Sequence, residues 1–128
     1  MLSSRLLQSR RSKLLALNPM TKELELLAPA KNKEIGIAAI NCGADAVYIA
    51  AESFGAREAA GNSIGDIKEL CYYAHKFHAK IFVVVNTILD DNETESAAKL
   101  IWDLYRAGAD AIIVQDLGVL RLNLPPIP

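Results

Sequence analysis

The chain has 128 residues, of which 52% are hydrophobic and 23% are charged, and its formal net charge is -1. This composition is typical of one globular domain and excludes the disordered class, and no apolar run approaches the ~18 residues that span a bilayer. Residues 21–128 hold 10 basic and 15 acidic residues, which excludes a general polyanion binder but leaves room for a local basic pocket.

Residues 1–20 form a basic extension rich in Arg, Ser and Leu and without acidic residues. It has the composition of a mitochondrial transit peptide, or it precedes a natural start at Met20. The second explanation is favoured because no small-residue cleavage site follows. We therefore leave this extension out of the fold and assign the domain to residues 21–128.

Four β-rich runs alternate with segments of helical period in the rest of the chain. The expected strands are residues 24–28, 46–50, 80–85 and 111–115, and the expected helices are 33–42, 65–78 and 93–107. This alternation indicates βαβ units around a parallel sheet, and the nearly continuous apolar strands predict a sheet covered on both faces. Polar caps are expected at Ser63 with Asp66 and at Asn92 with Glu95, and left-handed helix ends at Gly43 and Gly108.

The tetrapeptide Gly-Ala-Asp-Ala occurs at residues 43–46 and again at 108–111. The offset corresponds to two units of about 32 residues, the size of one βα repeat. We therefore predict an α/β fold, the N-terminal half of a TIM-type (β/α)8 barrel with four strands and three to four helices. A complete barrel needs eight units, so we expect a truncated barrel whose proline-rich residues 124–128 lead into a fifth strand. The alternative is a self-contained doubly wound sheet with helices on both faces.

The two cysteines, Cys42 and Cys71, are far apart and lack zinc-site spacing. Both fall on apolar faces of expected helices, which predicts reduced core residues and fits a cytoplasmic location. His75 and His78 lie near the end of a helix without a third ligand, so we predict no metal site.

Four motifs at the expected strand ends, the second of which has two parts (43–50 with 54–57), resemble the N-terminal part of peptidase family U32, the collagenase-like proteases. They are residues 25–32 (ELLAPAKN), 43–50 (GADAVYIA), 54–57 (FGAR), 83–86 (VVVN) and 108–116 (GADAIIVQD). The resemblance implies a TIM-type barrel. It implies a peptidase label, while several members are associated with hydroxylation of tRNA, ribosomal RNA or ubiquinone precursors. It also implies an iron-sulfur cluster held by later cysteines of a longer parent, and no cofactor in these residues. Lys31, Ala50, Ala51 and Gly55 depart from the common pattern.

Loops that follow barrel strands carry the chemistry, so the catalytic candidates are Glu52, Arg57 and Asp116. Glu52 could transfer a proton if burial raised its pKa toward neutrality, and Arg57 could clamp a carboxylate or phosphate. The two could equally pair with each other and hold the loop. Asp116 could bind a cation or act as a base, or it could be an ordinary helix N-cap.

The substrate-binding candidates are polar or turn residues at the same strand ends: Pro29, Asn32, Asn62, Asn86 and Gln115. The amides of Asn86 and Gln115 each offer one acceptor and two donors, which suit a base edge or a peptide group. No nucleophile elbow, H-E-x-x-H motif or evident Cys-His pair is present, so the peptidase label depends on the resemblance.

Three functions follow as expectations. The leading one is the N-terminal part of a U32 peptidase that acts on peptides, catalytically inactive when isolated. The second is hydroxylation of tRNA or ribosomal RNA by the same barrel. The third is a non-catalytic half barrel that forms a homodimer through its open sheet edges.

Overall fold

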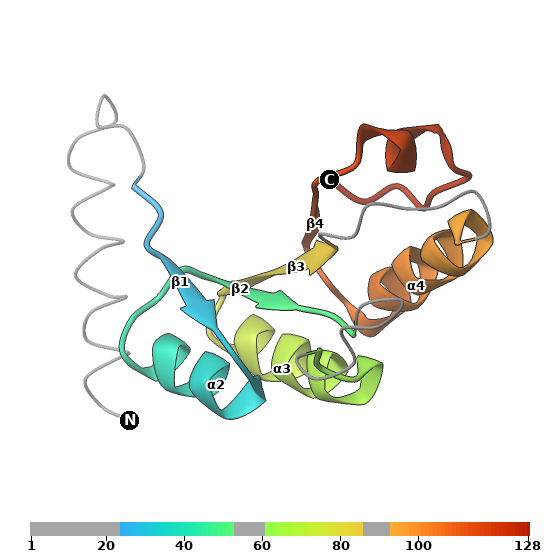
Figure 1. The fold of residues 1–128 in the computed structure, drawn as a ribbon. Coiled ribbons are helices and arrows are strands. Elements are labelled where there is room, and N and C mark those ends of the chain that lie inside the picture. Colours follow the sequence, from blue (N-terminus) through green and yellow to red (C-terminus); the bar gives the residue numbers. More distant parts are fainter. Residues whose placement is uncertain (1–23, 53–60, 86–92) are drawn as a thin grey trace.

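A computed structural model describes residues 24–52, 61–85 and 93–128. The elements in chain order are β1 (Leu27–Ala30), α2 (Lys33–Asn41), β2 (Ala46–Ala50), α3 (Ile64–Lys76), β3 (Lys80–Val85), α4 (Thr94–Ala107), β4 (Ala111–Val114) and the 3-10 helix η1 (Leu117–Arg121). All neighbouring strands are parallel, and their spatial order β1-β2-β3-β4 follows the chain. Figure 1 shows this open sheet with its helices.

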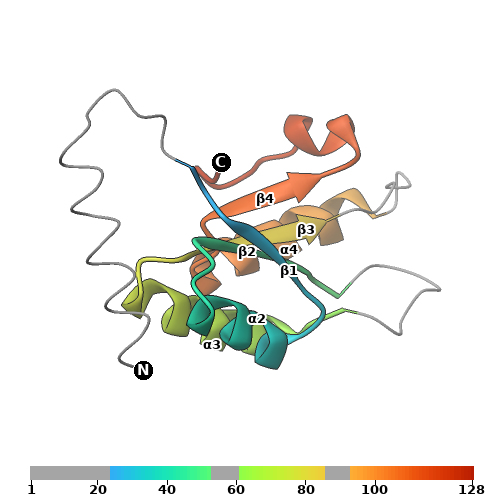
Figure 2. The same cartoon turned by 90° about the vertical axis from the view of Figure 1, so that its left-hand side faces the viewer.

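The three α-helices lie against one face of the sheet, as Figures 1 and 2 show from two sides. In β3, Ile81, Val83 and Val85 are buried, whereas the intervening Phe82 and Val84 are only partly covered. A strand with a helix layer on one side has this alternation. The expectation of a sheet covered on both faces was therefore wrong for the part of the chain that the structure describes.

Consecutive strand order and one-sided helices match half of a (β/α)8 barrel, since a doubly wound sheet carries helices on both faces. The predicted α/β fold class is confirmed, and the sheet is not closed. The extension at residues 1–20 lies outside the described residues. None of the described helices is both long and apolar enough to cross a bilayer.

The repeated Gly-Ala-Asp-Ala motif makes the same clamp at both of its positions. Asp45 donates its backbone N–H to the Leu26 carbonyl (2.9 Å), and its Oδ2 accepts from the Leu26 N–H at 2.7 Å. Asp110 does the same with Ile81, again at 2.9 and 2.7 Å. The glycines that begin the two motifs have the expected left-handed conformation, with φ of 101° at Gly43 and 99° at Gly108. The sequence repeat is therefore a structural repeat, and it anchors each strand to the one before it.

The observed bounds of five elements differ from the predicted ones: α2 ends one residue earlier, α3 begins one residue earlier and ends two earlier, β4 ends one residue earlier, and β1 and α4 differ as follows. β1 is residues Leu27–Ala30 rather than 24–28, because its pairing with β2 begins at Leu27 opposite Ala46 and Leu26 is held by Asp45. The third expected helix begins at Thr94 with Glu93 in the N-cap position. The predicted cap Asn92 lies outside the described residues.

The two cysteines differ in burial. Cys71 is 1% exposed and packs in the core, whereas Cys42 is exposed at the C-cap of α2, and both are free thiols. The prediction of a core residue was thus right for Cys71 and wrong for Cys42, because the buried side of α2 holds Gly36 and Ile40 and does not include Cys42.

After β4 the chain turns through η1 and returns to the sheet. The backbone N–H of Ile112 in β4 donates to the carbonyl of Pro128 at 2.9 Å, and Ile127 packs against the core. The indole N–H of Trp102 donates to the Asn123 carbonyl at 3.0 Å. These contacts hold the proline-rich segment against β4 and α4.

Candidate functional site

Because the four strands are parallel, their carboxyl ends meet at one edge of the sheet, which is where (β/α) barrels carry their chemistry. The described segments at this edge are the turn after β1, the end of β2 with residues 61–63, and the turn after β4. Arg57 and Asn86, two of the predicted site residues, lie outside the described residues.

Asn62 joins the first two strand ends. Its Nδ2 donates to the carbonyls of Lys31, after β1, and Ala50, the last residue of β2, each at 3.0 Å. Its backbone N–H also donates to Ala50, and its carbonyl accepts from the Glu52 N–H, both at 3.2 Å. The residue is only 8% exposed. Asn62 therefore ties the turn after β1 and the end of β2 into one unit.

Gly61 permits this close approach. A Cβ built on Gly61 would lie 2.1 Å from the Cα and 2.5 Å from the N of Glu52. Any side chain at this position would displace the backbone that carries Glu52, so only glycine fits.

Glu52, the first of the predicted catalytic residues, has an exposed side chain. The predicted proton-transfer role depended on burial of the carboxylate, which the described neighbours do not provide, and the role stays a prediction. Its predicted pairing with Arg57 concerns a residue that the structure does not describe. The observed role of Glu52 is the backbone hydrogen bond to Asn62.

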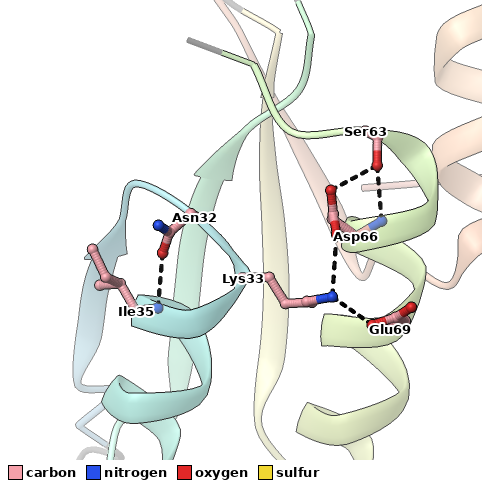
Figure 3. Close-up of polar contacts among 6 residues, drawn as sticks. All are labelled: Asn32, Lys33, Ile35, Ser63, Asp66 and Glu69. Atoms are coloured by element: carbon pink, nitrogen blue, oxygen red, sulfur yellow. Dashed lines mark hydrogen bonds and ion pairs between the residues drawn. The ribbon is translucent and has the colours of Figure 1, made fainter.

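A polar bridge connects the first turns of α2 and α3, as Figure 3 shows. The ammonium group of Lys33 lies 3.2 Å from Asp66 Oδ1 and 2.5 Å from Glu69 Oε2. The hydrogen bond to Glu69, followed by that to Asp66, raises the pKa of Lys33. The hydrogen bond from Ser63, followed by that from Lys33, lowers the pKa of Asp66.

Ser63 connects this bridge to the strand ends, because it contacts Asp66 and follows Asn62 in the chain. Its Oγ accepts from the Asp66 N–H at 3.1 Å and donates to Asp66 Oδ2 at 2.7 Å, which confirms the predicted cap. Since Ser63 follows Asn62 directly, one continuous set of contacts runs from the start of α2 to the end of β2. We call this set of contacts the frame; it comprises Lys31 to Lys33, Ala50 to Glu52, and Gly61 to Glu69.

The other predicted site residues are placed as follows. Asn32 is the N-cap of α2, and its Oδ1 accepts from the Ile35 N–H at 3.0 Å. Pro29 lies on the edge strand β1 opposite Tyr48, where its missing N–H costs no ladder bond. Gln115 is exposed after β4, and Asp116 caps η1 by accepting from the Gly118 N–H at 2.8 Å. The alternative of an N-cap thus describes the observed contact of Asp116.

Among the described residues, His75 and Cys71 of α3 form no polar site comparable to the frame at the carboxyl ends of the strands. His75 Nε2 lies 2.9 Å from Asp110 Oδ2, at the clamp before β4. Burial, followed by the charge of Asp110, raises the pKa of Cys71 to about 12, so its thiol stays protonated at neutral pH. In the described ranges, no three His, Cys, Asp or Glu side chains gather as a metal site.

Comparison with known proteins adds the family. The sequence pattern of peptidase family U32 matches residues 31–128. The chain belongs to peptidase family U32. The predicted resemblance is confirmed.

Relatives in this family carry names of two kinds. The chain is 58% identical over 104 residues to the 23S rRNA 5-hydroxycytidine C2501 synthase of Escherichia coli. The aligned region covers 81% of this chain and 16% of that protein. It is 38% identical over 98 residues to tRNA hydroxylation protein P1 of Bacillus subtilis, covering 76% of this chain and 23% of that protein. It is 33% identical over 100 residues to the uncharacterized protease MJ0090 of Methanocaldococcus jannaschii, and the aligned region covers 77% of this chain and 25% of that protein. The chain therefore spans a quarter or less of the length of these relatives.

Three residues of the site were missed by sequence reasoning. Gly61 precedes the predicted Asn62 and Ser63, and a lone glycine beside a cap was its only signal. Lys33 and Glu69 come from different helices, 36 residues apart. No short-range pattern indicates such a pair, because only helix packing brings their side chains together.

Proposed function

We propose that this chain supplies the first strand ends of an RNA-hydroxylating barrel whose target is a cytidine of ribosomal RNA. The observation that carries the proposal is the 58% identity over 104 residues with a 23S rRNA 5-hydroxycytidine synthase. The identity with a collagenase of Porphyromonas gingivalis over a similar length, 100 residues, is 27%. Substrate specificity depends on strand-end residues, and these are retained best between closely similar chains.

The chemistry of the described strand ends supports recognition of a neutral, hydrogen-bonding group. Asn32, Asn62 and Gln115 contribute amides, and an amide pairs with the edge of a nucleobase. An amide also pairs with a peptide group, so the choice of RNA over peptide depends on the identity with the rRNA enzyme.

The iron-sulfur cluster implied by the family resemblance does not fit these residues. Such clusters take about four cysteine ligands, whereas this sequence has two, one buried in α3 and one exposed after α2. We therefore assign substrate positioning to this part of the barrel and derive no cofactor step through it.

The test is nucleoside analysis in the organism that encodes the chain. Disruption of the gene is expected to remove 5-hydroxycytidine from digested 23S rRNA, measured by liquid chromatography and mass spectrometry, and reintroduction of the gene restores it. Loss of a hydroxylated nucleoside from tRNA alone would move the assignment to tRNA. Unchanged RNA nucleosides would overturn the proposal.

Peptide hydrolysis is the second candidate, and the 33% identity with an archaeal protein named as a protease favours it. The full-length gene product, incubated with gelatin and collagen, tests it directly. Cleavage above that of the heat-inactivated protein, together with unchanged RNA nucleosides, would establish the peptidase alternative.

A further inference from the structure

The side-chain amide of Asn62 has only one possible orientation. Both groups that it contacts, the carbonyls of Lys31 and Ala50, are hydrogen-bond acceptors without a proton to give. The Nδ2 must therefore face them and donate one hydrogen to each. Rotation of the amide by 180° would bring Oδ1 against two carbonyl oxygens and lose both bonds.

This orientation leaves the carbonyl oxygen Oδ1 of Asn62 as the group available to a ligand. In the part of the chain that the structure describes, Oδ1 has no hydrogen-bond partner. No side-chain nitrogen or oxygen there is sealed from solvent without a partner, so Oδ1 reaches the surface although the residue is only 8% exposed. It is a fixed acceptor at the carboxyl ends of β1 and β2.

We propose that Asn62 selects the target base by accepting, through Oδ1, a hydrogen bond from the exocyclic amino group of cytosine. This inference rests on the proposed function and names the group that reads the base. Cytosine presents an amino donor where uracil presents a carbonyl acceptor. A freely rotating asparagine could read either base by turning its amide, but the two backbone carbonyls prevent Asn62 from offering its N–H groups. Uracil would place an oxygen against Oδ1 and leave it unpaired.

The frame around Asn62 makes this acceptor rigid. Gly61 packs on the Glu52 backbone, and Ser63 caps α3, so the residues on both sides of Asn62 are held by the fold. A site with fixed polarity discriminates against a substrate that lacks the matching hydrogen bond.

The experiment compares two RNA hairpins bound to the full-length protein. Both carry the 23S rRNA segment around the hydroxylated cytidine, and one has this cytidine replaced by the pyrimidin-2-one nucleoside, which lacks only the amino group. For the wild-type protein, removal of the amino group is expected to weaken binding about tenfold, the effect of one hydrogen bond of about 1.4 kcal/mol. Uridine at this position is expected to bind more weakly still.

The Asn62→Ala variant is expected to bind the two hairpins equally, because the acceptor that distinguishes them is gone. Asp103→Ala is the control: it removes a surface contact with Arg106 on α4, outside the frame, and retains the Asn62 amide, so it keeps the tenfold difference. Equal binding of both hairpins by the wild-type protein overturns the inference. A tenfold difference that persists in Asn62→Ala overturns it as well.

If Asn62→Ala does not fold, the wild-type complex with a hairpin containing a 15N-labelled cytosine amino group decides the question by NMR. A nuclear Overhauser contact between the cytosine amino protons and the Asn62 side-chain amide supports the inference, and its absence in an assigned complex overturns it. These outcomes are separate from the proposed function, because a gene that controls 5-hydroxycytidine without base selection by Asn62 would contradict this inference alone.

Discussion

Asp45 and Asp110 show how one residue of a short repeat can organise a sheet. Each carboxylate accepts the backbone N–H of a residue in or before the neighbouring strand at 2.7 Å. A hydrogen bond to an ionised acceptor is stronger than one between neutral groups. The second residue of each pair is far away in sequence, so the motif alone shows neither its partner nor its role.

Replacement of Asp110 by alanine is expected to destabilise the chain by about 1–3 kcal/mol, because the Ile81 N–H is part-buried and loses its acceptor. The matched control is Asp103→Ala, which removes only a surface contact with Arg106 at 3.3 Å. That change is expected to cost less than about 1 kcal/mol. Urea denaturation followed by circular dichroism measures both values, and equal losses would show that the clamp at Asp110 is no stronger than a surface pair.

Gly61 and Gly65 offer a second matched pair at the residue scale. Gly61→Ala is expected to destabilise the chain by about 1–3 kcal/mol, because its Cβ would meet the Glu52 backbone. Gly65→Ala meets only Ser63 Oγ at 3.7 Å and lies in the first turn of α3. It is expected to stabilise the chain by about 0.5–1 kcal/mol through helix propensity. The midpoint of thermal unfolding should fall in Gly61→Ala and rise in Gly65→Ala, relative to the wild-type chain. A rise in both variants would contradict the close approach at Gly61.

The two thiols are expected to react at very different rates. Cys42 is exposed, whereas Cys71 is buried and its pKa is raised to about 12, so it forms almost no thiolate at neutral pH. In the native chain, iodoacetamide should modify Cys42 first, and Cys71 should react only after denaturant is added, as peptide mass spectrometry can show. The folded pKa of Cys71 exceeds the unfolded value near 9, so its contribution to stability is present below about pH 9 and is lost as pH rises toward 12.

At the scale of elements, α2 and α3 are joined at their N-terminal ends rather than by an apolar contact alone. Lys33 projects from α2 to two carboxylates of α3, and Ser63 caps the same turn. Gly36 of α2 lies against the core residue Leu70 of α3, so the helices also approach closely below the bridge.

Ser63→Ala is expected to cost about 1 kcal/mol, the usual effect of losing an N-cap. Lys33→Met retains the aliphatic stem and removes the charge. Its loss of unfolding free energy is expected to be smaller than that of Ser63→Ala and to shrink further at high salt, because the partners of Lys33 are solvent-exposed. Denaturation at low and high ionic strength separates the two effects. A strong salt dependence in Ser63→Ala would contradict this assignment, since the Asp66 N–H bond to Ser63 is not an ion pair.

At the scale of the whole molecule, the described sheet has one face without helices. Pro29, Tyr48 and Phe82 share a row on this face, and Tyr48 and Ile113 are 37% and 41% exposed. Apolar surface of this kind favours association. The homodimer predicted from the sequence remains a prediction.

The 128-residue chain is therefore expected to sediment as a dimer or larger species whose mass rises with concentration. Tyr48→Lys should shift it toward monomer, since a charge on the uncovered face opposes its burial. Tyr72→Lys is the control: Tyr72 is 68% exposed on α3, beside the ammonium of Lys76. A wild-type monomer at all concentrations, or an equal effect of both variants, would exclude association through this face.

Much of the fold was predictable from local patterns. β2 and β3 were placed with their observed bounds because each contains a continuous apolar run of strand length. Ser63, Gly43 and Gly108 were predicted correctly since caps and left-handed glycines depend on chemistry within a few residues. β1 was misplaced by three residues at its start because pairing with β2, rather than its own apolar run, sets its register.

The positions of the strand ends were predictable, whereas the roles of the candidate site residues remain predictions. Strand ends follow from the βα alternation, so Asn32, Asn62 and Asp116 were named as candidates. The N-cap contact of Asp116 was predicted as an alternative, whereas the hydrogen bonds of Asn32 and Asn62 were not predicted. The proton-transfer role of Glu52 was conditional on burial, and its side chain is exposed. Burial depends on neighbours from other elements, and no local pattern reports it.

The sequence by itself determined the alternation of strands and helices, the cap at Ser63, the left-handed glycines and the family, because these depend on short-range spacing and on motifs at strand ends. The tertiary structure decided which groups meet: Asn62 with the Lys31 and Ala50 carbonyls, Lys33 with Asp66 and Glu69, and Asp110 with Ile81. The physical reason is that hydrogen bonds and ion pairs act over a few ångströms, and only the packing of parallel strands and their helices brings residues 12 to 36 positions apart within that range.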